Sequence, residues 1–222
     1  DDDDDNDNYN NNDALLEIMD GLGEFQRANV KKICEKDNIG AVSRVLIKMY
    51  PHQIKSINSI YNAKRILCAD QMGMGKTYIT IGLMAKIWPF EWPILIVCPA
   101  MVRERWKNDI LEILHEFVQK NDIVIVDTIS NRIGTSKEQI INQKVVIISY
   151  HLLEAMTPQL LAVGFQTLIV DESHLIKNQL AIRTKTMKNL ATDIQRVLFL
   201  LRGPLPEKCL AGKHTNSISL CL

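Results

Sequence analysis

The sequence predicts an α/β domain in which a doubly wound, mostly parallel sheet carries helices on both faces. Short apolar runs rich in β-branched residues alternate along the chain with longer stretches that are typical of helices. The runs are almost continuously apolar, as expected of parallel strands that are buried on both faces. We expect strands at residues 65–69, 94–98, 123–126, 145–149, 167–170 and 197–201, and helices that include 46–62, 76–88, 101–118 and 179–193.

The expected domain occupies residues 46–204 and has additions at both ends. Residues 1–13 hold seven Asp and no Lys or Arg, and are expected to be a disordered Asp/Asn-rich tail. Residues 14–45 show a helical pattern and are expected to form a helical extension of unknown role, and residues 205–222 form a tail without an assigned fold. Because its first residue is Asp and not Met, the chain is expected to be part of a longer protein.

Composition excludes several classes of protein. A chain of 222 residues with 46% hydrophobic and 23% charged residues is typical of a globular protein that builds its own core. No apolar run approaches the ~18 residues of a membrane-spanning helix, so we expect no membrane partner. The five cysteines show neither CxxC nor metal-ligand spacing, which favours buried thiols in a reducing compartment.

The net charge of zero hides an uneven distribution. When the seven acids of residues 1–13 are set aside, 19 acidic residues face 26 basic ones, a charge of about +7. A basic body of this kind suits a polyanion such as nucleic acid, although lysine-rich helix surfaces have the same composition.

A glycine-rich segment, DQMGMGKT at residues 70–77, follows the first expected strand and precedes an expected helix. Glycines let backbone N–H groups close around phosphate oxygens, and the helix N-terminus adds the positive end of its dipole. In such a loop Lys76 reaches the β- and γ-phosphates of a nucleotide, and the Thr77 hydroxyl ligates Mg²⁺. The strict pattern GxxxxGK[ST] has Gly where this chain has Asp70, so the match is to its GxGKT core. A tight turn with incidental glycines is the alternative.

Two acidic residues follow the strand expected at 167–170. Asp171 and Glu172 would lie at the carboxyl ends of the parallel strands, where such sheets bind ligands. Asp171 can hold Mg²⁺, and Glu172 can orient and deprotonate an attacking water. An isolated Asp-Glu pair is more often a solvated strand end, but combined with the glycine-rich loop it predicts a nucleoside triphosphatase.

In combination these motifs resemble the Swi/Snf-type ATPases of helicase superfamily two, and within them the annealing helicases of the HARP-domain, replication-fork-remodelling type. The resemblance is carried by YPHQ at 50–53, DQMGMGKT at 70–77, WPILIVCP at 92–99, Val102, Arg103 and Trp106, DESH at 171–174 and KN at 177–178. It covers residues 45–204.

The resemblance implies the first RecA-like, P-loop lobe of an ATP-dependent DNA translocase or annealing helicase, which acts in DNA repair and replication-fork remodelling in the nucleus. ATP and Mg²⁺ are the implied cofactors, and double-stranded or forked DNA is the implied partner. By the same resemblance, Gln53 recognises adenine, and the rest of the nucleotide site consists of Asp70, Gln71, Met72, Gly73, Met74, Gly75, Lys76 and Thr77.

The resemblance also assigns roles in hydrolysis and in DNA contact. Lys76, Asp171 and Glu172 are the implied catalytic residues, with Thr77 and Asp171 on Mg²⁺. Pro99, Arg103, Ser149 and His151 lie where members of this family contact the DNA backbone.

Two departures from the family pattern bear on activity. Where the family has a Ser-Gly-Thr-Pro-like motif that couples hydrolysis to DNA movement, residues 201–204 read LRGP and lack both hydroxyls. Two explanations are open: an error in the gene model or in splicing, or a copy of the domain that is uncoupled or inactive. The resemblance also implies a second lobe, whose arginine fingers can be worth ~10³–10⁵ in rate and which we expect in the parent protein and not in this chain. We therefore expect nucleotide binding with little hydrolysis, and no translocation, by this chain alone.

Two other functions are open at this point. The chain can be a degenerate single-lobe module that binds ATP or DNA without catalysis, a hypothesis that the altered segment at 201–204 favours. It can also be a different P-loop enzyme such as a nucleotide kinase, but kinases lack the segments at 92–99 and 171–178.

Overall fold

The computed structural model describes residues 38–69, 73–126, 140, 142–176 and 181–201. Its six strands form one sheet in the order β1-β6-β5-β2-β4-β3, and every neighbouring pair is parallel. The strands are β1 (Arg65–Cys68), β2 (Ile94–Cys98), β3 (Ile123–Val126), β4 (Val145–Ser149), β5 (Thr167–Val170) and β6 (Arg196–Leu200). The expected parallel α/β fold is confirmed, with each strand within one residue of its expected bounds.

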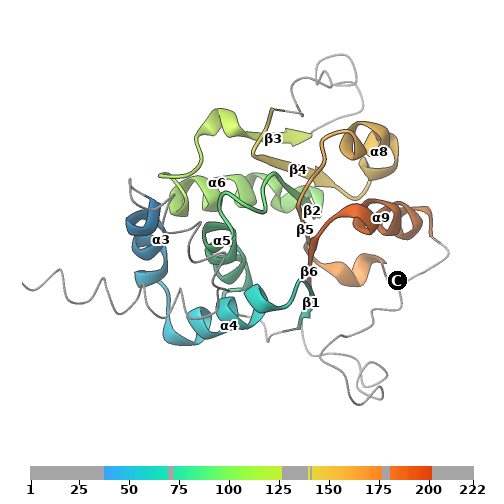
Figure 1. The fold of residues 1–222 in the computed structure, drawn as a ribbon. Helices are drawn as coiled ribbons and strands as arrows, with labels where there is room; N and C mark the ends of the chain where they lie inside the picture. Colours follow the sequence, from blue (N-terminus) through green and yellow to red (C-terminus); the bar gives the residue numbers. More distant parts are fainter. Residues whose placement is uncertain (1–37, 70–72, 127–139, 141, 177–180, 202–222) are drawn as a thin grey trace, which may run out of the picture.

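Helices cover both faces of the sheet (Figure 1). Four lie on one face: α3 (Asn38–Ile47), α4 (Pro51–Asn62), α5 (Lys76–Lys86) and α6 (Arg103–Ile113). Two lie on the other: α8 (Leu153–Leu161) and α9 (Ile182–Asp193). Short 3-10 turns occupy Ala100–Val102, Lys120–Asp122 and Ser173–Ile176. No helix in these described ranges is long and apolar enough to cross a bilayer.

The strands divide their side chains between two hydrophobic cores. In β2, Ile94, Ile96 and Cys98 belong to the core that α3, α4, α5 and α6 cover, whereas Leu95 and Val97 belong to the core under α8 and α9. Successive strand residues point to opposite faces, so a strand covered on both sides must be apolar throughout. This is the physical reason for the almost continuous apolar runs in the sequence.

The single helix expected at residues 46–62 is wrong, because the chain forms two helices there. Helix α3 ends at Ile47, and α4 begins at Pro51. Proline has no N–H to donate and disfavours helical geometry in the residue before it, and Tyr50 is accordingly extended, with ψ 151°. Helix α3 also crosses the expected boundary at residue 45 and places Ala41 and Val45 in the main core. The tails expected at 1–13 and 205–222 lie outside the described residues.

Helices α4 and α5 pack closely at Gly82. A Cβ atom added at this glycine would lie 2.5 Å from Ile57 Cδ1 and 2.7 Å from Met49 Cε. We expect Gly82→Ala to lower the free energy of unfolding by about 1–2 kcal/mol, since overpacking outweighs the gain of about 1 kcal/mol in helix propensity. Urea denaturation measures this change. In a Met49→Ala background, which empties part of the space, the cost of Gly82→Ala should shrink, and an equal cost in both backgrounds would contradict the packing argument.

A buried ion-pair cluster joins elements at the edge of the sheet where the strands begin. Arg196, the first residue of β6, is 1% exposed and donates to both Glu91 oxygens, at 2.5 and 3.2 Å. Lys64 Nζ donates to Glu91 Oε1 at 2.5 Å. The Arg196 guanidinium also donates to the carbonyl oxygens of Ile60, Tyr61 and Ala63 at the end of α4. The cluster therefore ties α4 and β6 to the segment that enters β2.

Candidate nucleotide-binding site

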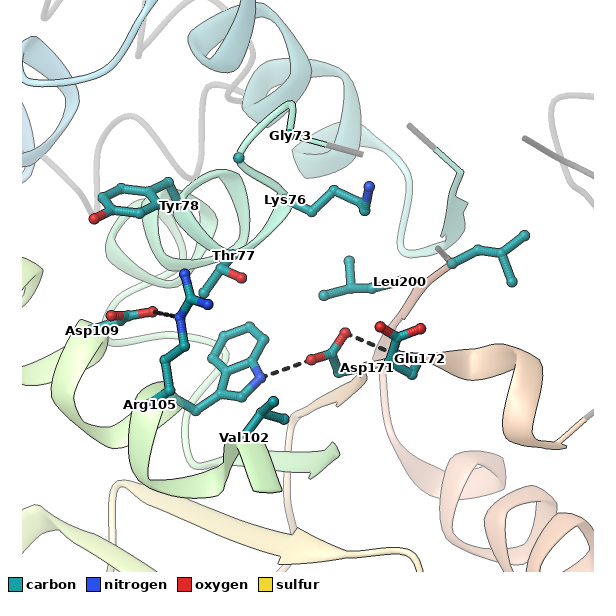
Figure 2. A pocket seen from close by; sticks show the side chains of 13 residues that line it. Gly73, Lys76, Thr77, Tyr78, Val102, Arg105, Asp109, Asp171, Glu172 and Leu200 are labelled. Atoms are coloured by element: carbon teal, nitrogen blue, oxygen red, sulfur yellow. Dashed lines mark hydrogen bonds and ion pairs between the residues drawn. The ribbon is translucent and has the colours of Figure 1, made fainter. Parts of the chain in front are cut away.

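A pocket of about 390 Å³ lies at the carboxyl ends of the strands, between the start of α5, helix α6 and the end of β5 (Figure 2). Its volume is within the range of small-molecule sites. It is lined by Gly73, Gly75, Lys76, Thr77, Tyr78, Val102, Arg105, Trp106, Asp109, Asp171, Glu172, Leu200 and Leu201. The pocket thus brings together the glycine-rich loop and the acidic pair, which are far apart in the sequence.

The described part of the glycine-rich loop has the geometry of an anion-binding turn. Gly73 and Gly75 have φ values of 85° and 75°, in the left-handed region that favours glycine. Helix α5 begins directly afterwards at Lys76, so its first N–H groups, which have no acceptor within a helix, lie at the pocket with the positive end of the helix dipole. Residues 70–72, which complete the expected loop, lie outside the described residues.

Gln53 and Met74 do not line the pocket. Gln53 is 7% exposed, and its Oε1 accepts a hydrogen bond from the backbone N–H of Tyr50 at 3.0 Å. A Cβ atom added at Gly75 would lie 2.4 Å from Gln53 Nε2, so the side-chain amide of Gln53, on α4, packs directly against the glycine-rich loop. Met74 is 40% exposed.

The acidic pair follows β5 in a tight turn. The Asp171 N–H donates to the Val97 carbonyl at 2.8 Å, which continues the pairing of β5 with β2. Glu172 has φ 51°, an uncommon left-handed conformation for a residue with a side chain. Its N–H donates to Asp171 Oδ1 at 2.8 Å, and its Oε2 lies 3.1 Å from His174 Nδ1. This turn directs both carboxylates into the pocket (Figure 2).

Asp171 is held from two further directions. Trp106 Nε1, on α6, donates to Asp171 Oδ2 at 3.0 Å, and the Tyr150 hydroxyl donates to the Asp171 carbonyl oxygen. Burial, reinforced by the negative charge of Asp171, raises the pKa of the Tyr150 phenol and raises that of the Cys98 thiol to about 12. Both groups therefore stay neutral near pH 7, and Tyr150 keeps the proton that it donates.

The pocket offers the donor set that Mg²⁺ and phosphate need. The Thr77 hydroxyl and the Asp171 carboxylate are hard oxygen donors of the kind that Mg²⁺ prefers. Lys76, on the same wall as Thr77, carries the positive charge that suits a polyphosphate. The residues present therefore fit a Mg²⁺–nucleoside triphosphate.

The four candidate DNA-contact residues follow or end two neighbouring strands: Pro99 follows β2, Arg103 begins α6, Ser149 ends β4 and His151 lies in the loop after it. Cys98 of β2 pairs with Ser149 of β4, so the loops that begin with Pro99 and Tyr150 leave the sheet side by side. His151 is exposed and Ser149 is buried. The Arg103 guanidinium donates to the carbonyl oxygens of Val126 at 2.6 Å and Ala100 at 3.2 Å, which anchors the start of α6 to the end of β3.

Residues 41–208 match the family described as the SNF2-related domain. The chain belongs to this family. The resemblance to Swi/Snf-type ATPases is thereby confirmed, and family membership implies the use of a nucleotide.

Curated relatives of this SNF2-related domain include annealing helicases. The chain is 33% identical over 163 residues to the SWI/SNF-related matrix-associated actin-dependent regulator of chromatin subfamily A-like protein 1 of Xenopus laevis, which covers 73% of this chain and 16% of the relative. It is 30% identical over 168 residues to the human DNA annealing helicase and endonuclease ZRANB3, which covers 72% of this chain and 15% of the relative. The chain thus spans less than a quarter of the length of these relatives.

A solved structure shares the fold. The Sulfolobus solfataricus SWI2/SNF2 ATPase core in complex with dsDNA superimposes with a TM-score of 0.55 at 24% sequence identity, over 71% of this chain and 32% of that one. The expected RecA-like lobe is therefore confirmed at the level of the fold.

One wall of the pocket was not predicted as part of the site. Val102, Arg105, Trp106 and Asp109 recur at helical spacing and turn one face of α6 toward the loop and the acidic pair. Arg105 Nε lies 3.6 Å from Asp109 Oδ2 (Figure 2). The spacing was visible in the sequence, but only the fold shows that this face meets Asp171.

The end of β6 also lines the pocket. Strand β6 lies between β1, which leads into the glycine-rich loop, and β5, which ends at Asp171. Leu200 and Leu201 therefore lie between the two halves of the site, and Leu201 is the first residue of the segment that departs from the family pattern.

Proposed function

We propose that this chain is the first ATP-binding lobe of a DNA-dependent ATPase of the annealing-helicase type, and that the pocket binds MgATP. The observation that most supports the proposal is that Lys76 and Thr77 of α5 and Asp171, directly after β5, line one pocket at the N-terminus of α5. A structural turn with incidental glycines gives no reason for an acidic pair from β5 to share that pocket.

In this proposal each side chain has a distinct role. The first N–H groups of α5 and the Lys76 ammonium bind the β- and γ-phosphates, and Thr77 and Asp171 hold Mg²⁺, which neutralises charge on the phosphate oxygens. Glu172 orients a water for attack on the γ-phosphorus and accepts its proton as the bond between that phosphorus and ADP breaks. In this proposal residues 70–72 and Met74 belong to the phosphate loop, and Gln53 recognises the adenine.

We propose that the partner is double-stranded or forked DNA. Outside residues 1–13 the chain carries about +7 by formal count, which favours a polyanion. The proposed DNA contacts are Pro99 and Arg103, which follow β2, and Ser149 and His151 at the end of the neighbouring strand β4. The archaeal neighbour is described in complex with dsDNA, and the curated relatives by name regulate chromatin or anneal DNA. From the resemblance to annealing helicases we also propose a role in DNA repair and fork remodelling in the nucleus.

We further propose that efficient hydrolysis requires a second RecA-like lobe. Arginine fingers that stabilise charge in phosphoryl transfer can be worth ~10³–10⁵ in rate. The described residues that line the pocket supply one arginine, Arg105, which is paired with Asp109. Binding of MgATP is therefore the activity expected of this chain alone.

Hydrolysis assays with and without forked DNA test the proposal. The purified chain should bind labelled ATP in the presence of Mg²⁺ and turn it over slowly, and Glu172→Gln should keep the binding and lose the residual turnover. Absence of ATP binding would contradict the proposed site. Rapid DNA-stimulated turnover that Glu172→Gln abolishes would contradict the need for a second lobe.

The second candidate function is a single-lobe module that binds ATP or DNA without catalysis. It is favoured by Leu200 and Leu201, whose side chains line the pocket without any group able to hydrogen-bond to nucleotide or water. Adding the second lobe of a relative in the same polypeptide separates the two functions. Turnover should appear if the chain is an ATPase lobe, and binding without turnover would indicate the degenerate module.

A further inference from the structure

We propose that Trp106 is a positioning residue that fixes the Asp171 carboxylate in the orientation in which it holds Mg²⁺. This inference rests on the proposed function and adds to it a residue of α6. Trp106 is 2% exposed, lines the pocket, and donates its indole N–H to Asp171 Oδ2 at 3.0 Å (Figure 2).

The two carboxylate oxygens of Asp171 are held by different donors. The backbone N–H of Glu172 donates to Oδ1 at 2.8 Å, and the indole of Trp106 donates to Oδ2 at 3.0 Å. A carboxylate oxygen has two lone-pair sites, so each oxygen keeps acceptor capacity for a metal. Rotation of the carboxylate about its bond to Cβ would break both hydrogen bonds. The pair of donors therefore selects one rotamer before Mg²⁺ arrives.

The chemistry of indole suits this position. The indole N–H is a donor only and carries no charge, so it orients the carboxylate without repelling a divalent cation. A Lys or Arg in its place would repel the cation. The ring is fixed, because Trp106 packs in the core between α6 and the sheet. Partners that orient a metal ligand in this way typically contribute 10–100-fold to metal affinity.

A purely structural role is the alternative, and the chain offers a matched control for it. Trp92 belongs to the same core, is 9% exposed, and donates its indole N–H to the Met84 carbonyl at 3.2 Å. It does not line the pocket. Trp92→Phe and Trp106→Phe thus each remove one buried indole hydrogen bond, but only the second touches Asp171.

The test measures how much Mg²⁺ strengthens nucleotide binding. The affinity of a fluorescent ATP analogue is determined in Mg²⁺ and in EDTA for the wild type and both variants, and thermal denaturation confirms that each variant is folded. Trp106→Phe should reduce the ratio of the two affinities on the order of 10-fold and leave the affinity in EDTA unchanged. Trp92→Phe should leave the ratio at the wild-type value. In an Asp171→Asn background, Trp106→Phe should have no further effect.

The outcomes separate this inference from the function on which it rests. A wild-type chain that binds no ATP overturns the proposed function. A wild-type chain whose ATP affinity rises with Mg²⁺, combined with an unchanged ratio in folded Trp106→Phe, overturns the positioning role alone.

A second measurement needs no change at Trp106. The indole N–H resonance of Trp106, observed by NMR in the wild type, should shift between metal-free ATP and MgATP, and the resonance of Trp92 should not. In Asp171→Asn the Trp106 shift should disappear. A Trp106 resonance that does not respond to Mg²⁺ in the ATP-bound wild type contradicts the proposal even if Trp106→Phe does not fold.

Discussion

Glu91→Ala is expected to lower the free energy of unfolding by about 3–5 kcal/mol, because it leaves Arg196 charged, buried and without a carboxylate partner. The guanidinium would keep only its hydrogen bonds to backbone carbonyls at the end of α4. Urea denaturation followed by circular dichroism measures the change. Glu116→Ala is the matched control, since Glu116 pairs with Arg44 on the surface and its loss should leave the free energy of unfolding nearly unchanged. Equal losses in the two variants would contradict the account of the cluster.

The same cluster predicts a pH dependence of stability. Burial by itself raises the pKa of Glu91, but hydrogen bonds from Arg196 and Lys64, and their charges, outweigh it and bring the pKa below its ordinary value of 4.5. A carboxylate with a depressed pKa contributes its full stabilisation above the pKa of the unfolded chain, and loses it as the pH falls through the folded-state value. The wild type should therefore lose stability below about pH 4.5 more steeply than Glu91→Gln. Parallel curves for the two proteins would contradict the assigned pKa.

Lys76→Ala is expected to weaken binding of MgATP on the order of 100-fold, because it removes the ammonium that pairs with the β- and γ-phosphates. Binding of AMP, which lacks both phosphates, should change little. Calorimetric titration of ATP and AMP into the two proteins gives both affinities. Lys185→Ala provides the control, since Lys185 is exposed on α9, on the opposite face of the sheet. Equal weakening of ATP and AMP would show that Lys76 does not act on the terminal phosphates.

The parallel sheet could be predicted from the sequence because burial on both faces imposes almost continuous apolar runs. The boundaries of the helices were harder to predict from the sequence. Pro51 divides the stretch at 46–62, where an apolar stripe continues across the break. Helix α8 contains Pro158, which removes a helical hydrogen bond and disfavours a helix by sequence alone. The helix forms in spite of Pro158, and three of its side chains pack into the core: Leu153, Met156 and Leu160.

In the candidate site, too, some residues could be predicted from local sequence motifs, and others are placed there only by the fold. Four site residues could be predicted because each lies in a short motif whose neighbouring residues indicate its chemistry: Lys76, Thr77, Asp171 and Glu172. The contact between Trp106 and Asp171 depends on the rotation of α6 over the sheet and on the pairing of β2 with β5. No local pattern encodes that rotation, so the α6 wall of the pocket emerged only from the structure.

Hydrogen exchange of the wild-type chain with and without MgATP tests the central claim most directly, because it reports where the nucleotide binds. MgATP should slow exchange at the glycine-rich loop and the start of α5, residues 73–78, and at the turn after β5, residues 171–174. Helices α8 and α9, on the opposite face of the sheet, should exchange at unchanged rates. Protection confined to those two helices, or no protection at saturating MgATP, would contradict the assignment of this pocket as the nucleotide site.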